Sequence, residues 1–334
     1  MAEVVVLEHP KSTYISKSIS EELSDLGVHI THIGIDRSTF PNGEKYYRFQ
    51  IDSNFDLLGK TSVYIASLTS DDDILDIFRV GSSLAQAGIK RRIFVIPYLA
   101  YLSMDREFHP GEVVTAKCNS QMFGIIGAAN EGNVFLFLDL HYECILHYFE
   151  GPCLRVELKA QNALIRAIAE QNYPHDTLTM GSTNLRRAAW VNSYAQAMNI
   201  PISFIREKPK PDQAEFISQP DYIIGNVKGR RIIIYDDILR SGKTLINAAK
   251  CYMAAGATSV VGVVTHFAGY NEQSINDLAN SNLEKIIMTN SHPITQSPLV
   301  QEIDKFVVVD VADIFTQCLY EILPTPEHMH RSSL

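Results

Sequence analysis

Short apolar runs alternate along the chain with stretches in which apolar residues recur at helical spacing. Residues 92–99 and 134–140 are apolar at nearly every position, which is typical of parallel strands covered by helices on both faces. Residues 71–87 carry an apolar side chain every three or four positions and precede Gly88, which predicts an amphipathic helix closed by a glycine. Further strands are expected at 4–7, 62–68, 177–181, 202–206, 221–225, 232–235, 259–266, 285–289 and 306–309, and further helices at 12–26, 156–171, 185–198, 244–255 and 311–323.

The order of these elements predicts an α/β fold with two similar doubly wound domains. Strands and helices alternate in two sets, and each set predicts a mostly parallel sheet flanked by helices. A Glu-Gly-Pro turn at 150–152 interrupts the pattern between the sets. We therefore expect one domain from residues 1–155 together with a C-terminal helical segment, 311–334, and a second domain from 156–310.

Composition and charge narrow the classes of partner. The chain has 334 residues, of which 46% are hydrophobic, and its net charge is −9. A protein that binds nucleic acid usually shows a basic excess, so nucleic acid is not an expected partner. No apolar run approaches the ~20 residues that span a bilayer, and the first residues lack the basic start of a signal peptide. There are five cysteines, an odd number, and their positions do not match a metal-ligand spacing, so we expect a cytoplasmic protein. Because no long apolar run occurs, we also expect that it does not bind membranes.

The segment YDDILRSGKT carries the most specific chemical pattern in the chain. The expected strand 232–235 is followed by Asp236 and Asp237, then by a short loop, and a helix is expected to begin at Thr244. Ligands of parallel α/β sheets bind beyond the carboxyl ends of strands, where a helix N-terminus offers unpaired N–H groups and a positive dipole end. The string SGKT also resembles a Walker A loop, but that motif needs a glycine where Asp237 stands. A strand–loop–helix connection with ordinary capping residues is the alternative without function.

Each residue type in this loop suits a sugar phosphate. Ser241 and Thr244 offer hydroxyl donors, and Gly242 allows the backbone to approach a phosphate closely. The two aspartates would repel a phosphate alone. They fit a ligand whose sugar hydroxyls donate hydrogen bonds to them, directly or through Mg²⁺. The sequence therefore predicts a site for a phosphorylated pentose.

The same string resembles the phosphoribosyl-diphosphate-binding loop of the phosphoribosyltransferase superfamily. Four segments of the first half, FPNGE, IPYLAYLSMDRE, VVTAK and DLHYECILHYFEGP, together with GATSVVGVVTH in the second half, resemble ribose-phosphate diphosphokinases in the expected order. The resemblance covers about residues 4–323. It implies two domains of phosphoribosyltransferase type and an oligomer of identical subunits, dimer-based and up to a hexamer. It also implies transfer of the diphosphoryl group of ATP to ribose 5-phosphate, with Mg²⁺ as cofactor.

The resemblance also implies roles for individual residues. In an oligomer, the FPNGE loop would reach the ATP site of a neighbouring subunit. The catalytic candidates are Arg206, Lys208 and His141, and the metal candidates are His141 and Asn184. The ribose 5-phosphate contacts would be Asp236, Asp237, Arg240, Ser241, Gly242, Lys243 and Thr244. The ATP contacts would be Phe40, Asn42, Glu44, Ser103, Met104, Asp105, Arg106 and His141.

Simpler interpretations exist for several of these residues. FPNGE would form a tight turn between strands in any protein. His141 follows a buried strand and would serve equally as a satisfied polar group, while Asp105 and Arg106 would suit a solvated loop. Lys208 has a charged surface loop as its alternative.

Several positions depart from the family pattern. Ser103 and Met104 stand where the family has Arg-Gln, and Asn184 stands where it has a metal-linked aspartate. Arg186 and Arg187 replace two glycines, and Glu207 and Pro209 occupy the positions of a catalytic lysine and arginine. Three hypotheses follow: a divergent diphosphokinase, a regulatory homologue without catalysis, and a phosphoribosyltransferase that uses the same loop.

Overall fold

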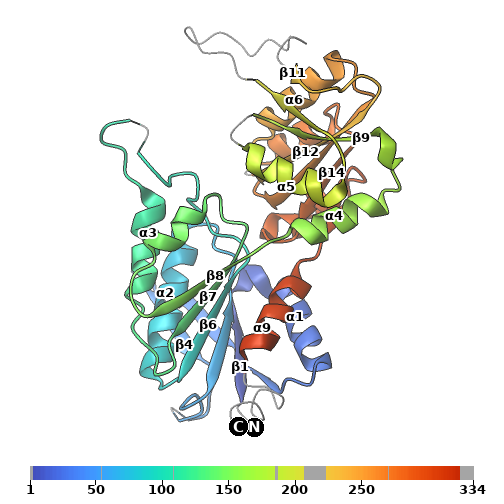
Figure 1. Ribbon diagram of the computed structural model, residues 1–334. Helices are drawn as coiled ribbons and strands as arrows, with labels where there is room; N and C mark the ends of the chain where they lie inside the picture. The colour runs from blue at the N-terminus through green and yellow to red at the C-terminus, as the bar shows by residue number, and fades with distance from the viewer. Residues whose placement is uncertain are drawn as a thin grey trace. The chain divides into compact units, whose positions relative to one another are not determined.

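The structure is a computed structural model that describes residues 3–53, 55–107, 109–184, 187–206, 223–269 and 271–323, apart from the side chain of residue 143. The chain forms two compact units (Figure 1). Unit 1 consists of Met1–Lys159 and Val311–Leu334, and unit 2 consists of Ala160–Asp310. Within the described part of the chain, no helix has both the length and the apolar character needed to cross a membrane.

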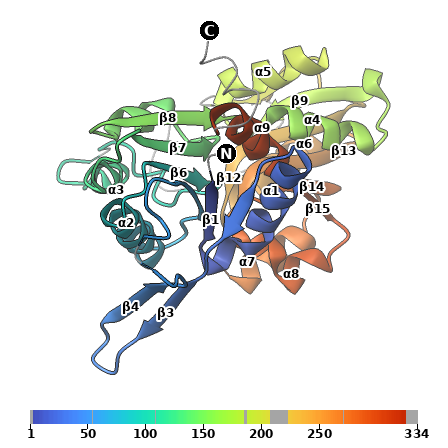
Figure 2. The same cartoon turned by 90° about the horizontal axis from the view of Figure 1, so that it is seen from below.

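Unit 1 is built on a parallel six-stranded sheet in the order β2-β1-β5-β6-β7-β8. Helices α2 and α3 cover one face of this sheet, and α1 and α9 cover the other (Figure 1). A two-stranded antiparallel hairpin, β3 with β4, projects from the unit (Figure 2). The strands are β1 (Val4–Glu8), β2 (Ile30–His32), β3 (Ile35–Thr39), β4 (Lys45–Phe49), β5 (Thr61–Ile65), β6 (Arg91–Ile96), β7 (Asn133–Leu138) and β8 (Cys153–Leu158). The helices are α1 (Thr13–Asp25), α2 (Asp71–Gln86), α3 (Thr115–Gly124) and α9 (Ala312–Ile322).

Unit 2 has a seven-stranded sheet in the order β11-β10-β9-β12-β13-β14-β15. Only the short edge strand β11 runs antiparallel to its neighbour among these described strands. The strands are β9 (Leu178–Ser182), β10 (Ile202–Ile205), β11 (Ile223–Ile224), β12 (Arg231–Leu239), β13 (Ser259–Phe267), β14 (Lys285–Thr289) and β15 (Phe306–Val309). The helices are α4 (Gln161–Glu170), α5 (Ala188–Met198), α6 (Lys243–Ala254), α7 (Glu272–Ala279) and α8 (Pro298–Gln301).

The apolar runs of the sequence form the cores of both units. The central strands β6 and β7 are buried along almost their whole length, as expected for parallel strands covered on both faces. In unit 2, the apolar stripe of α6 packs with β12 and β13 in one buried cluster. The mixed α/β class with mostly parallel, helix-flanked sheets is thus confirmed.

The structure corrects several expected elements. Val156–Leu158 lie in strand β8 and not at the start of a helix, because the backbone pairs with β7 at an edge of the sheet. The sequence CLRVEL is partly exposed on both faces, so its apolar pattern does not distinguish a strand from a helix. Helix α3 was not expected, since its sequence lacks a continuous apolar stripe. A tight turn between strands was expected at FPNGE, but the ranges of β3 and β4 were not among the expected strands, because most of their residues are exposed.

Candidate functional site

The predicted sugar-phosphate loop joins β12 to α6. The strand is longer than expected and runs through Leu239, so the two aspartates lie within β12 and not after it. Gly242 precedes the helix with φ of +76°, a conformation that favours glycine. A Cβ atom there would also lie 2.6 Å from Leu278 Cδ2. Glycine is therefore required by the turn and by packing against α7, in addition to any approach of a ligand.

The first turn of α6 presents its polar groups to solvent. Arg240, Lys243 and Thr244 are exposed, and Ser241 is half-buried. The N-cap residue Gly242 has no side chain to cap the helix, and the N–H of Lys243 lies 3.5 Å from the hydroxyl of Ser241. The first N–H groups of a helix have no partner within the helix, so this turn can accept an anion. The loop thus brings together the donors that the sequence predicted.

The acid pair is in contact with an arginine. Arg187 Nη2 lies 2.5 Å from Asp237 Oδ1, and Arg187 Nε lies 3.6 Å from Asp236 Oδ1. Asp237 and Arg187 are buried, whereas the side chain of Asp236 is 17% exposed. Burial and then the neighbouring charge of Asp237 raise the pKa of Asp236 to about 7, although Arg187 opposes the shift. The sequence noted Arg187 only as a replacement for glycine, and its contact with the aspartates was missed.

The other predicted residues of unit 2 lie at neighbouring strand ends. Asn184 follows β9, which pairs with β12, and its amide donates to the hydroxyl of Thr183 at 3.4 Å. Arg206 follows β10 and is exposed. Lys208, the other catalytic candidate of this loop, lies outside the described residues, as do Arg186, Glu207 and Pro209.

In unit 1, the loops after β6 and β7 bring Asp105, Arg106 and His141 into one cluster. Arg106 Nη2 lies 2.6 Å from Asp105 Oδ2, and the guanidinium lies 4.2 Å from the ring centre of Tyr142. The His141 ring meets the same tyrosine edge-on at 4.6 Å. Asp105 is 1% exposed and accepts a hydrogen bond at its backbone carbonyl from Tyr148, so it does not belong to a solvated loop. Ser103 and Met104 lie half-buried in the loop that leads to Asp105.

Two residues near this cluster have left-handed backbone conformations without being glycine. Tyr101 has φ of +68° and Asp139 has φ of +37°. Such conformations cost on the order of 1–3 kcal/mol each and are often found at functional sites. Tyr142 and Asp139 were missed by sequence reasoning. The signal available for them was their position beside His141 in the string DLHY.

Phe40, Asn42 and Glu44 form the tip of the hairpin between β3 and β4. The Glu44 N–H donates to Asn42 Oδ1, and the Phe40 N–H donates to the Glu44 carbonyl. The tight turn therefore forms, as the simpler interpretation predicted. Phe40 is 49% exposed and meets Tyr46 edge-on, so about half of the residue remains accessible to another molecule.

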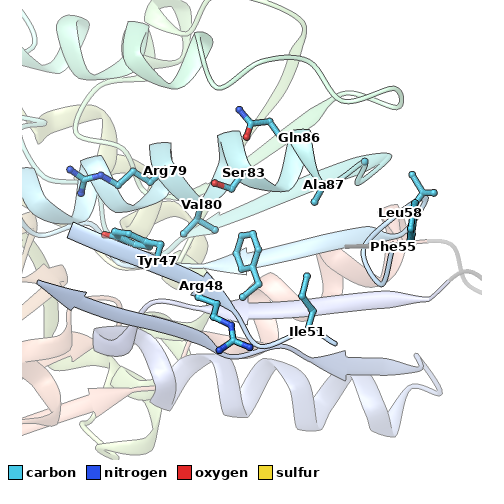
Figure 3. A pocket seen from close by; sticks show the side chains of 12 residues that line it. Tyr47, Arg48, Ile51, Phe55, Leu58, Arg79, Val80, Ser83, Gln86 and Ala87 are labelled. Atoms are coloured by element: carbon cyan, nitrogen blue, oxygen red, sulfur yellow. The ribbon is translucent and has the colours of Figure 1, made fainter. Parts of the chain in front are cut away.

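A cavity of about 540 Å³ lies in unit 1 between the hairpin and α2 (Figure 3). Apolar side chains and two arginines, Arg48 and Arg79, line it. No predicted site residue belongs to the lining of this cavity.

Comparison with known protein families decides the relationship. Residues 4–127 match the family model for the N-terminal domain of ribose phosphate pyrophosphokinase, and residues 182–330 match the phosphoribosyl synthetase-associated domain. The chain belongs to the ribose-phosphate pyrophosphokinase family. This family consists of enzymes, and it is the one that the sequence resembles.

Related proteins align with this chain over nearly its whole length. It is 29% identical over 314 residues to a ribose-phosphate pyrophosphokinase of Clostridium acetobutylicum, with 92% of each chain covered. It is 28% identical over 303 residues to one of Pyrococcus abyssi, covering 88% of this chain and 93% of that protein. The crystal structure of phosphoribosylpyrophosphate synthetase from Mycobacterium smegmatis has the same fold, with a TM-score of 0.81 and 19% identity. The alignment covers 96% of this chain and 98% of that one.

Proposed function

We propose that the protein is a ribose-phosphate diphosphokinase. It transfers the diphosphoryl group of Mg-ATP to the C1 hydroxyl of ribose 5-phosphate, giving phosphoribosyl diphosphate and AMP. The observation that carries the proposal is the loop between β12 and α6, where an acid pair precedes a helix start with exposed donors. Relatives named ribose-phosphate pyrophosphokinase, matched over most of their length, support it.

On the pentose side, the N–H groups of the first turn of α6 bind the 5-phosphate. Ser241, Lys243 and Thr244 add hydroxyl and ammonium donors, and Arg240 adds a further cation at the loop. Asp236 accepts a hydrogen bond from a ring hydroxyl, because its carboxylate is the partly exposed one of the pair. Asp237 contributes indirectly, through its ion pair with Arg187.

On the nucleotide side, the cluster after β6 and β7 binds ATP. Arg106 and His141 contact the phosphates, and Tyr142 holds the guanidinium and the imidazole ring in position. Ser103 and Met104 line the same loop. The hairpin tip, with Phe40, Asn42 and Glu44, recognises the adenine of a neighbouring subunit, so the working form is a homo-oligomer in the cytoplasm.

Magnesium would enter with the nucleotide. Its candidate ligands are the His141 ring in unit 1 and the Asn184 amide oxygen in unit 2, each considered within its own unit. The ion supplies charge neutralisation on the phosphates. The amide oxygen of Asn184 is an oxygen ligand of the kind that Mg²⁺ accepts. Arg206, together with Lys208, stabilises the charge on the transferring diphosphoryl group, while the other residues position the two substrates.

A regulatory homologue that binds the ligands without catalysis is the second candidate. The contact between Arg187 and Asp237 favours it, because a guanidinium occupies a carboxylate that the pentose would otherwise reach. The replacement of the family's aspartate by Asn184 favours it as well.

A turnover assay separates the candidates. Purified protein is incubated with Mg-ATP and ribose 5-phosphate, and AMP is followed by chromatography. We expect AMP and phosphoribosyl diphosphate in equal amounts. Binding of both substrates without AMP would instead support the regulatory homologue. A requirement for a nucleobase and for preformed phosphoribosyl diphosphate would support a phosphoribosyltransferase.

Two exposed lysines on α6 provide a matched pair of variants for this assay. Lys243 lies in the first turn, whereas Lys250 lies further along the same helix. Loss of a hydrogen bond to a charged group costs about 1.5–3 kcal/mol, so Lys243→Ala should raise the KM for ribose 5-phosphate roughly ten- to a hundred-fold. Lys250→Ala should leave it unchanged, and equal effects of the two would contradict the placement of the phosphate.

A further inference from the structure

A single guanidinium contacts both carboxylates of the acid pair. Arg187 lies 2.5 Å from Asp237 and 3.6 Å from Asp236, and only 10% of its side chain is exposed. It precedes the first residue of α5, and the strand from which the aspartates project, β12, pairs with β9 just before this loop. The contact therefore joins two neighbouring strand ends of unit 2.

Packing of α5 holds the guanidinium in this position. Trp190 and Tyr194 both contact the Tyr235 ring, with ring centres 5.9 Å and 4.5 Å apart. Trp190 and Tyr194 are four residues apart and so lie on one face of α5, and Arg187 stands at its N-cap, three residues before Trp190. Asp237 is two residues beyond Tyr235 and shares its face of β12. The face of α5 that covers Tyr235 thus also places Arg187 on Asp237.

The positive charge of Arg187 reduces the negative charge that a bound cation would have to neutralise at the acid pair. Two adjacent carboxylates carry two negative charges, which a divalent cation would neutralise when a sugar hydroxyl binds. With Arg187 in place, the three side chains carry one net negative charge when all are ionised. A buried guanidinium beside the pair also repels a second cation.

We propose that Arg187 is the resident counter-ion of Asp236 and Asp237, so that ribose 5-phosphate binds to unit 2 without a divalent metal ion. Arg187 acts as a positioning residue: it keeps Asp237 in place, and Asp236 retains an exposed face for a ring hydroxyl. This inference rests on the proposed pentose site. It does not concern the magnesium that accompanies ATP.

Calorimetric titration of the full chain with ribose 5-phosphate tests the proposal, once in excess EDTA and once in millimolar MgCl₂. The wild-type dissociation constant should agree within about two-fold between the two buffers. Arg187→Ala should show no measurable binding in EDTA and should regain it with Mg²⁺, because the uncompensated pair becomes a cation site. A purely structural role for Arg187 would not create such a dependence on metal.

Two further variants keep the test decisive if Arg187→Ala does not fold. Arg187→Lys retains the charge and should bind in EDTA within about ten-fold of the wild type. The double variant Arg187→Ala/Asp237→Asn removes both buried charges, so it should again bind without Mg²⁺. Circular dichroism confirms the fold of each variant.

The outcomes also separate this proposal from the proposed function. A wild type that binds ribose 5-phosphate only with Mg²⁺ would overturn the counter-ion role and leave the pentose site intact. Metal-independent binding by Arg187→Ala at wild-type affinity would overturn it as well. No binding by the wild type in either buffer would overturn the pentose site itself, and the inference with it.

Discussion

Asp236 lies beside a second carboxylate and a guanidinium, in a part of unit 2 that water reaches only in part. Its carboxyl group therefore holds a proton more strongly than usual, and its pKa of about 7 falls within the physiological range. The protonation state of this one side chain decides whether the pocket carries an acceptor or a donor for a sugar hydroxyl. At the residue scale, the protonation of Asp236 depends on its burial as much as on the identity of the residue.

This raised pKa predicts a pH dependence of stability. The pKa of Asp236 rises from 3.8 to about 7 on folding, so its protonated form stabilises the folded state fully below about pH 4. That contribution is lost as the pH rises towards 7. Between about pH 5 and about pH 8, the free energy of unfolding should fall on the order of 1–3 kcal/mol more for the wild type than for Asp236→Asn. Urea unfolding at both pH values measures this, and identical losses would contradict the raised pKa.

Helix α6 begins where a backbone turn and a packing contact coincide. Gly242 has φ of +76° and lies against Leu278 of α7, whereas Gly229 has φ of +72° with open space around it. Both Gly→Ala changes impose a left-handed conformation at a cost of about 1–2 kcal/mol. Gly242→Ala also overpacks the contact with Leu278, which typically adds about 1–3 kcal/mol. Chemical denaturation should therefore show a larger loss of the free energy of unfolding for Gly242→Ala than for Gly229→Ala. Equal losses would show that α7 shifts to accommodate the added methyl group without cost.

At the same scale, sequence patterns identified the elements with strong periodicity. Strands β6, β7 and β12 were predictable because they are apolar on both faces. Strand β8 and helix α3 were not, because edge exposure and a weak apolar stripe leave no distinctive period.

The candidate site also has a part that the sequence predicts and a part that it does not. The donors around Gly242 were predictable because they are consecutive in the chain. The contact of Arg187 with Asp237 was not, since it joins residues 50 positions apart through the pairing of β9 with β12. Tyr142 was missed for a related reason, because its role depends on the loop after β6.

At the scale of the whole molecule, each unit carries one half of the proposed chemistry. Unit 2 carries the pentose loop, and unit 1 carries the cluster of Asp105, Arg106, Tyr142 and His141. Diphosphoryl transfer requires both substrates to be held at once, so loss of either cluster should abolish turnover. The pentose site comes first in this function, because the loop between β12 and α6 is the most specific feature of the chain.

A crystal structure of the full chain with ribose 5-phosphate tests that claim most directly. We expect the 5-phosphate within hydrogen-bonding distance of the first-turn amides of α6, with a ring hydroxyl on Asp236. Pentose density at another position, with no phosphate at the start of α6, would contradict this placement of the pentose site.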